Sequence, residues 1–134
     1  MKGKKILIVE DEPRIALALC RALELPVSGT PQVDISPVAE TAIAKLQSES
    51  FDLVITDLRM PGMGGVELMR HIRDTSPHTR LMLITAYGSP DVEDVTRRLG
   101  AAYLPKPFTL RDFVNTVEEI LQNAPRNGER GQTG

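Results

Sequence analysis

The sequence has no tryptophan and only one cysteine, Cys20. A single thiol allows neither an internal disulfide nor a cysteine-based metal site, so we expect Cys20 to pack within a helix. No apolar run approaches the ~20 residues of a membrane-spanning helix. The apolar run behind the basic N-terminus, residues 6–9, is too short for a signal peptide. These absences predict a soluble cytoplasmic protein with no membrane association.

An excess of charge of one sign is also missing, because the formal net charge is −2 over 134 residues. A chain with this charge balance lacks the excess of basic residues that is typical of nucleic-acid-binding proteins. We therefore expect no direct nucleic-acid binding by this domain. The length suits one domain with one core, which we place at residues 4–123. Residues 124–134 are polar and glycine-rich without periodicity, and we expect a disordered tail, a linker or a tag there.

Strand and helix patterns alternate five times along the chain. Short apolar or alternating runs predict strands at residues 5–9, 33–35, 52–57, 81–85 and 101–104. Helical spacing follows each of them, and proline or capping signals mark four helix starts: Pro13, Ser36-Pro37, Ser89-Pro90 and Thr109 with Asp112. This alternation predicts an α/β fold in which right-handed βαβ units build a parallel sheet covered on both faces.

Four of the five predicted strands end in a side chain that carries a functional group. The most prominent is Asp57, which closes a buried apolar run and precedes a turn rich in proline and glycine. Parallel strands place their carboxyl ends at one edge of the sheet, where ligands bind. We therefore expect five side chains to converge in one shallow pocket: Glu10, Asp11, Asp57, Thr85 and Lys106.

Carboxylates held so close together repel one another, and a divalent cation relieves that repulsion. An all-oxygen site suits Mg²⁺, with Glu10 and Asp11 as the expected carboxylate ligands. Asp57 would be both a metal ligand and a nucleophile, because carboxylates form acyl phosphates. Lys106 and the Thr85 hydroxyl would contact the phosphoryl oxygens that the metal leaves free.

Two other classes of protein share some of these features. A flavodoxin-like flavin carrier needs a loop rich in hydroxyls and glycine after the first strand, but residues 10–12 are acidic. An aspartate-based phosphatase or phosphotransferase usually needs a second aspartate two positions after the first, where this chain has Arg59. Flavin absorbance would revive the first alternative, and steady turnover of a phosphate ester the second. The glycines at 62, 64 and 65 match no phosphate-binding motif, and we interpret them as turn residues.

Taken together, residues 10–12, 56–65, 85–86 and 106–108 resemble the response-regulator receiver domain of bacterial two-component signalling, and the resemblance covers about residues 4–122. It implies a flavodoxin-like (βα)5 three-layer sandwich with a parallel five-stranded sheet in the order 2-1-3-4-5. It also implies that Asp57 becomes an aspartyl phosphate in a Mg²⁺-dependent reaction. The donor would be a sensor histidine kinase or a histidine phosphotransfer protein, for which acetyl phosphate often substitutes.

The same resemblance assigns roles to individual residues. The main-chain carbonyl of Arg59 would join Glu10, Asp11 and Asp57 as a Mg²⁺ ligand. Lys106 would pair with the phosphoryl group, and the peptide bond that follows it, before a proline, is typically cis. Thr85 and Tyr103 would form the conformational switch. The domain would be a regulatory phosphoacceptor rather than an enzyme, catalysing only its own phosphorylation and dephosphorylation.

Two further expectations concern the surface. The fourth predicted helix, residues 90–99, has few apolar residues and leaves much of its surface for a partner. We expect it to form a signalling face with the fifth strand and fifth helix, for an output domain or a homodimer. Arg59 and Tyr87 flank the mouth of the site and neither is suited to orient a water, so we expect a long-lived phosphorylated form.

Overall fold

The computed structural model describes residues 1–25 and 29–123. The tail predicted at residues 124–134 lies outside the described residues. Within the described ranges, no helix combines the length and the apolar character that crossing a membrane would require.

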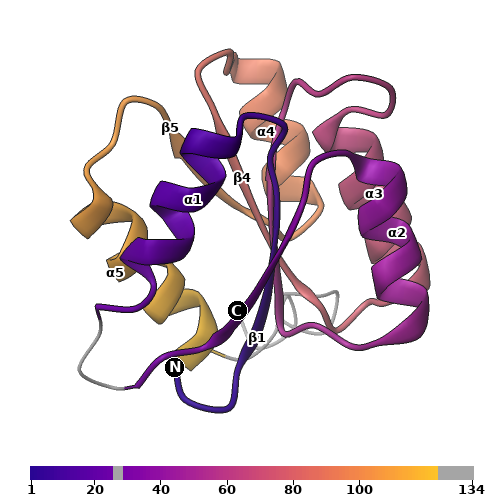
Figure 1. Ribbon diagram of the computed structural model, residues 1–134. Coiled ribbons are helices and arrows are strands. Elements are labelled where there is room, and N and C mark those ends of the chain that lie inside the picture. Colours follow the sequence, from indigo (N-terminus) through magenta and orange to yellow (C-terminus); the bar gives the residue numbers. More distant parts are fainter. Residues whose placement is uncertain (26–28, 124–134) are drawn as a thin grey trace.

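The described residues form one sheet of five parallel strands, in the order β2-β1-β3-β4-β5 (Figure 1). This order and direction confirm the predicted fold class. The apolar runs of β3 and β4 are almost fully buried, as expected of strands covered on both faces. The strands are β1 Lys5–Val9, β2 Gln32–Ser36, β3 Leu53–Asp57, β4 Arg80–Thr85 and β5 Ala102–Pro105.

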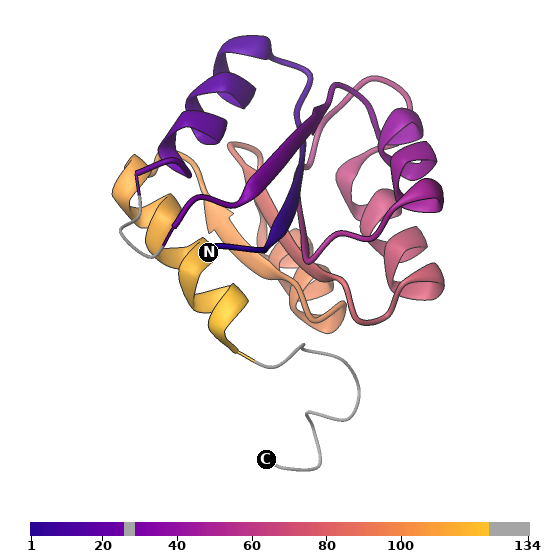
Figure 2. The ribbon, with the colours of Figure 1, turned by 60° about the horizontal axis from the view of Figure 1, so that its bottom comes forward.

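A helix follows each strand, and the helices lie on both faces of the sheet (Figures 1 and 2). One core cluster joins the sheet to the first and last helices and contains the buried Phe113, with Cys20 packed partly buried against it. The other cluster lies on the opposite face, under the second and third helices. The helices are α1 Pro13–Ala22, α2 Ala39–Ser48, α3 Gly65–Thr75, α4 Pro90–Arg98 and α5 Leu110–Gln122.

Three of the four predicted helix starts are confirmed: Pro13 is the first residue of α1, and hydrogen bonds confirm the starts of α4 and α5. The Ser89 hydroxyl accepts from Val92 N at 3.1 Å and caps α4. The Thr109 hydroxyl accepts from Asp112 N at 2.9 Å while the Asp112 carboxylate accepts from Thr109 N, which completes a capping box at α5. These caps place α4 and α5 directly after the loops that follow β4 and β5.

The predicted start of the second helix at Ser36-Pro37 is wrong. Ser36 is the last residue of β2, where it is the register partner of Val9 in β1, and α2 begins only at Ala39. The pairing keeps the chain extended at Ser36, and its hydroxyl donates to Val38 O at 3.3 Å rather than capping a helix. A serine before a proline marks the region of a helix start, but the sheet decides where the strand ends.

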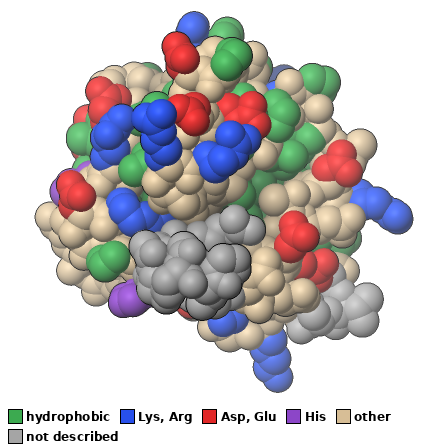
Figure 3. Space-filling view, turned by 180° about the vertical axis from the view of Figure 1, so that it is seen from behind, with side chains coloured by type: hydrophobic (Ala, Val, Ile, Leu, Met, Phe, Trp, Pro, Cys, Tyr) green, Lys and Arg blue, Asp and Glu red, His purple; other side chains and the backbone are tan. Residues whose placement is uncertain are grey.

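The fourth helix has the sparsest core contact of the five. Thr96 is the one residue of α4 that is buried, and its hydroxyl donates back to Val92 O at 2.7 Å. Its outer surface carries the ion pairs Arg97–Glu93 and Arg98–Asp94 at 2.7 and 2.8 Å. Acidic and basic side chains are interspersed over the upper part of the molecule when it is seen from behind (Figure 3). The helix ends at Arg98 with Leu99 as its C-cap, and Gly100 follows as the predicted C′ glycine with a φ of 71°.

Candidate functional site

The carboxyl ends of β1, β3 and β5 bring three charged side chains together. Asp57 is the last residue of β3, and its residue surface is only 8% exposed. Lys106, directly after β5, places its Nζ 3.0 Å from Asp57 Oδ2 and 3.9 Å from Glu10 Oε1. Glu10 follows β1 and is 2% exposed. The chain thus assembles two buried carboxylates around one ammonium group at the edge of the sheet.

One oxygen of Glu10 accepts no hydrogen bond from the described residues, although Lys106 Nζ lies 3.9 Å away. Its Oε2 accepts from Glu12 N at 3.1 Å, whereas Oε1 is buried and accepts no hydrogen bond within the described part of the chain. The pKa of Glu10 is raised from 4.5 to about 7, chiefly by burial and also by the charge of Asp57, while the Glu12 N–H and Lys106 act in the opposite direction. A carboxylate in this position favours either a proton or an added cation.

The donor set fits a hard divalent cation. Mg²⁺ is usually bound by one or two carboxylates together with other oxygen ligands and waters, and the unpartnered Glu10 Oε1 beside Asp57 offers such a start. Asp11 is exposed immediately after Glu10. Across residues 1–25 and 29–123, no three acidic, histidine or cysteine side chains are grouped so that they could hold a metal by themselves. Carbonyl and water oxygens would therefore complete the set, with the Arg59 carbonyl as the expected main-chain ligand.

The loop after β3 is held close to Asp57. Leu58 N donates to Asp57 Oδ1 at 2.6 Å, and Gly65 N donates to Leu58 O at 2.8 Å. A Cβ on Gly65 would lie 2.2 Å from the backbone oxygen of Asp57, so only glycine allows this approach. Glu40 of α2 adds an anchor by accepting from Met63 N at 3.3 Å. The glycine-rich turn therefore acts as scaffolding for the site, as interpreted from the sequence.

Thr85 closes the site on the β4 side. It is 1% exposed, and its hydroxyl oxygen accepts from Tyr87 N at 2.9 Å. Its carbonyl accepts from Lys106 N at 2.8 Å, which ties the ends of β4 and β5 together. The peptide bond between Lys106 and Pro107 is cis, which confirms that expectation. Thr85 therefore lies beside the Asp57–Lys106 pair with its hydroxyl oxygen engaged by a neighbouring main-chain N–H.

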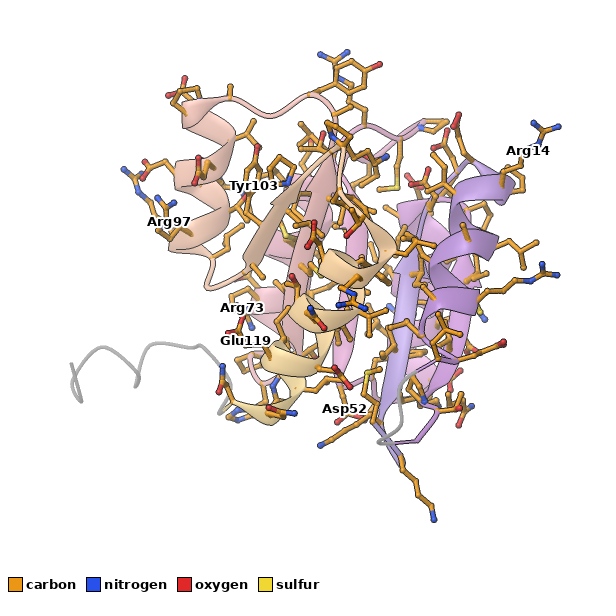
Figure 4. All side chains as sticks on the ribbon, turned by 90° about the vertical axis from the view of Figure 1, so that its left-hand side faces the viewer. Arg14, Asp52, Arg73, Arg97, Tyr103 and Glu119 are labelled. Carbon is orange, nitrogen blue, oxygen red and sulfur yellow. The ribbon has the colours of Figure 1, made fainter. Side chains whose placement is uncertain are left out.

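Tyr103 packs against the loop that joins β4 to α4. A Cβ placed on Gly88 would lie 1.7 Å from the Tyr103 hydroxyl oxygen, so the phenol end of the ring rests directly on the Gly88 backbone. Figure 4 shows Tyr103 on the side of the sheet that faces α4. The sequence singled out Tyr103 but not Gly88. The only available signal was a glycine three positions after Thr85 and just before the Ser89 cap.

The sequence also did not predict a contact between Arg59 and Tyr87. The Arg59 guanidinium lies over the ring of Tyr87, with 4.0 Å between the guanidinium carbon and the ring centroid. Each residue stands two positions after a strand end, Asp57 in one case and Thr85 in the other. Their separate positions beside the site were predicted, whereas their mutual contact depends on how the two loops approach each other.

Comparison with known proteins identifies the class to which this fold and site belong. The sequence profile of the response regulator receiver domain matches residues 6–118. The chain belongs to this family and is a receiver domain of two-component signalling. The match favours a receiver domain over the flavin carrier and the aspartate-based phosphatase.

Individual relatives agree with the family match. The chain is 40% identical over 129 residues to the response regulator protein FleR of Pseudomonas aeruginosa, which covers 95% of this chain but 27% of FleR. It is 37% identical over 122 residues to the response regulator receiver protein CpdR of Brucella abortus, covering 88% of this chain and 97% of CpdR. The crystal structure of a CheY-like receiver domain from Methanospirillum hungatei matches with a TM-score of 0.81 at 30% identity, over 98% of both chains.

Proposed function

We propose that this receiver domain is a phosphorylation switch in which Asp57 accepts a phosphoryl group from the phosphohistidine of a sensor kinase or phosphotransfer protein. The observation that carries the proposal is the convergence of Glu10, Asp57 and Lys106 from three separate strand ends. A carboxylate that is 8% exposed, paired with an ammonium group and adjacent to an unpartnered buried carboxylate oxygen, has the components of phosphoryl transfer chemistry.

The transfer is a single displacement at the phosphorus atom. A carboxylate oxygen of Asp57 bonds to phosphorus while the phosphorus–nitrogen bond of the donor breaks. The electron pair stays on the donor imidazole, which takes up a proton. Charge spreads over the three equatorial oxygens of the phosphoryl group in the transition state. Lys106 is placed to stabilise one of them, because its Nζ is already 3.0 Å from Asp57 Oδ2.

Bound Mg²⁺ would neutralise the negative charge that gathers on the carboxylates and the incoming phosphoryl group. Glu10, Asp57 and the Arg59 carbonyl would hold it, and the exposed Asp11 would join them by turning inward. The chain's own contribution is to fix the acceptor. Leu58 N–H orients Asp57 Oδ1, and Lys106 orients Asp57 Oδ2. The domain would thereby catalyse its own phosphorylation and dephosphorylation without turning over a separate substrate.

The switch would follow from contacts that differ between the two states. Thr85 would turn its hydroxyl toward a phosphoryl oxygen, and Tyr103 would move with the loop that carries Gly88. A phosphoryl group shifts a conformational equilibrium only through such differential interactions. The buried hydroxyl of Thr85 and the direct contact between Tyr103 and Gly88 support this route from the site to α4.

The output face would be formed by α4, β5 and α5, which line a hollow of about 310 Å³. Arg97, Tyr103 and Glu119 line it from the three elements (Figure 4). The sparse core contact of α4 supports a helix that responds to the switch and meets a protein partner, either an output domain or a second copy of the chain. Sedimentation velocity with and without BeF₃⁻, which mimics a phosphoryl group on a carboxylate, tests the second case.

Acetyl phosphate provides a test that needs no cognate kinase. Incubation with acetyl phosphate and Mg²⁺ should add the mass of one phosphoryl group to the intact chain, and EDTA should abolish the gain. The chain should take up no label from a phosphate monoester under the same conditions. A mass gain that is equally fast in EDTA would contradict the metal-dependent mechanism.

A further inference from the structure

The contact between Arg59 and Tyr87 joins two loops across the mouth of the site. Arg59 lies in the loop after β3 and Tyr87 in the loop after β4. The guanidinium carbon is 4.0 Å from the ring centroid, well inside the range of about 6 Å for cation–π attraction. Tyr87 is nonetheless 56% exposed, so burial in the core does not account for the position of its ring.

The same tyrosine also holds Thr85. Tyr87 N donates to Thr85 Oγ1 at 2.9 Å, so its main chain engages the hydroxyl while its ring engages Arg59. Thr85 is buried, and its hydroxyl has little freedom unless the loop moves. For Thr85 to rotate toward a phosphoryl oxygen, Tyr87 N–H must lose its acceptor or shift with it. A shift of Tyr87 would pull its ring away from Arg59.

We propose that the Arg59–Tyr87 stack is a clasp that stabilises the resting position of Thr85 and opposes the switch. The inference rests on the proposed function, because it assumes that Thr85 turns toward a phosphoryl group on Asp57. Arg59 and Tyr87 act here as positioning residues through their side chains, apart from any role of the Arg59 carbonyl. Removing the clasp destabilises only the resting state, so it raises the population that is ready to bind a phosphoryl group.

Binding of BeF₃⁻ in the presence of Mg²⁺, measured by calorimetry on the full chain, tests the clasp. Tyr87→Ala and Arg59→Met should each bind BeF₃⁻ about two- to fivefold more tightly than the wild type, the range expected for an exposed cation–π contact. Tyr87→Phe keeps the ring and should match the wild type. The double variant Arg59→Met/Tyr87→Ala should bind no more tightly than either single variant, because the two residues form one contact.

Unchanged or weaker binding in Tyr87→Ala and Arg59→Met, or additive effects in the double variant, would overturn the clasp. So would a Tyr87→Phe variant that behaves like Tyr87→Ala. A second measurement is independent of phosphoryl chemistry: the Arg59 side-chain protons should show a ring-current shift by NMR in the wild type and Tyr87→Phe, and lose it in Tyr87→Ala. Its absence in the wild type would overturn the clasp alone.

The two proposals fail in different ways. If the folded wild type does not bind BeF₃⁻ with Mg²⁺ at all, the proposed function fails and the clasp fails with it. If the wild type binds BeF₃⁻ and the four variants all share its affinity, only the clasp is wrong.

Discussion

Lys106 Nζ lies 3.0 Å from Asp57 Oδ2, although the two residues are 49 positions apart and stand at the ends of strands that are not neighbours in the sheet. β4 lies between them, and the Lys106 main chain is bonded to Thr85 at the end of that strand. The sheet therefore fixes the ammonium group beside the carboxylate before any ligand arrives. In the proposed function this pair is the starting point of the reaction.

Replacing Lys106 with methionine should slow phosphorylation by acetyl phosphate by about 100- to 1,000-fold. A preorganised charge that stabilises a transition state typically contributes about 2.7–4 kcal/mol, and methionine keeps most of the length of the side chain without the charge. Initial rates of mass gain measure the effect. Lys45→Met is the matched control, because Lys45 lies on α2 in a long 3.8 Å pair with Asp34 and should leave the rate unchanged. Equal rates in the two variants would exclude Lys106 from the reaction.

Glu10 should make the metal-free domain less stable as the pH rises. Its pKa is raised from 4.5 to about 7 in the folded chain, chiefly by burial. Between those values the folded state binds more protons than the unfolded state, so the free energy of unfolding falls with increasing pH and levels off above about pH 7. Urea unfolding in EDTA between pH 5 and 8 measures this slope.

Glu10→Gln removes the titrating group and isolates its contribution from other ionisable residues. The variant should show a shallower decline than the wild type over the same interval and a higher relative stability at pH 8. Parallel curves for the two proteins would show that Glu10 titrates at its ordinary pKa.

Gly88→Ala should displace the Tyr103 ring. The added Cβ would lie 1.7 Å from the Tyr103 hydroxyl oxygen, so one of the two groups must move. Overpacking of this kind costs about 1–3 kcal/mol of unfolding free energy. The cost should vanish when the same substitution is made in a Tyr103→Ala background, because no ring remains to collide with. A destabilisation that persists in the double variant would point to backbone strain at Gly88 instead.

The phosphorylated form should persist for minutes or longer after the donor is removed. Hydrolysis needs a group that orients a water and accepts its proton, and the guanidinium of Arg59 has no acceptor while the Tyr87 phenol is a weak base. Retention of the added mass after rapid desalting into Mg²⁺ buffer measures the lifetime. Loss of the label within seconds would mean that another group activates the water.

Much of the fold and part of the site could be predicted from local patterns. Apolar runs fixed the central strands, and the strand ends then placed Glu10, Asp57 and Lys106 at one edge, because parallel strands share a direction. The error at Ser36 has a physical cause: the residue carries a cap signal, but its pairing with Val9 extends the strand. Local propensity cannot include a bond to a distant strand.

The two contacts that the sequence did not predict depend on how loops approach each other in space. Arg59 and Tyr87 were each placed at the mouth of the site, but their stacking requires two loops from different strands to approach within 4.0 Å. Gly88 was not singled out, since its importance lies in the Tyr103 hydroxyl that rests on it. The unpartnered Glu10 Oε1 likewise follows from burial, which no spacing of acidic residues reveals.

The most direct test of the central claim is the intact mass of three proteins after incubation with acetyl phosphate and Mg²⁺. The wild type should gain the mass of one phosphoryl group, and Asp57→Asn should gain none. Asp74→Asn, a substitution at an exposed position of α3, should gain it as the wild type does. An Asp57→Asn protein that still gains one phosphoryl group would contradict the assignment of Asp57 as the phosphoacceptor.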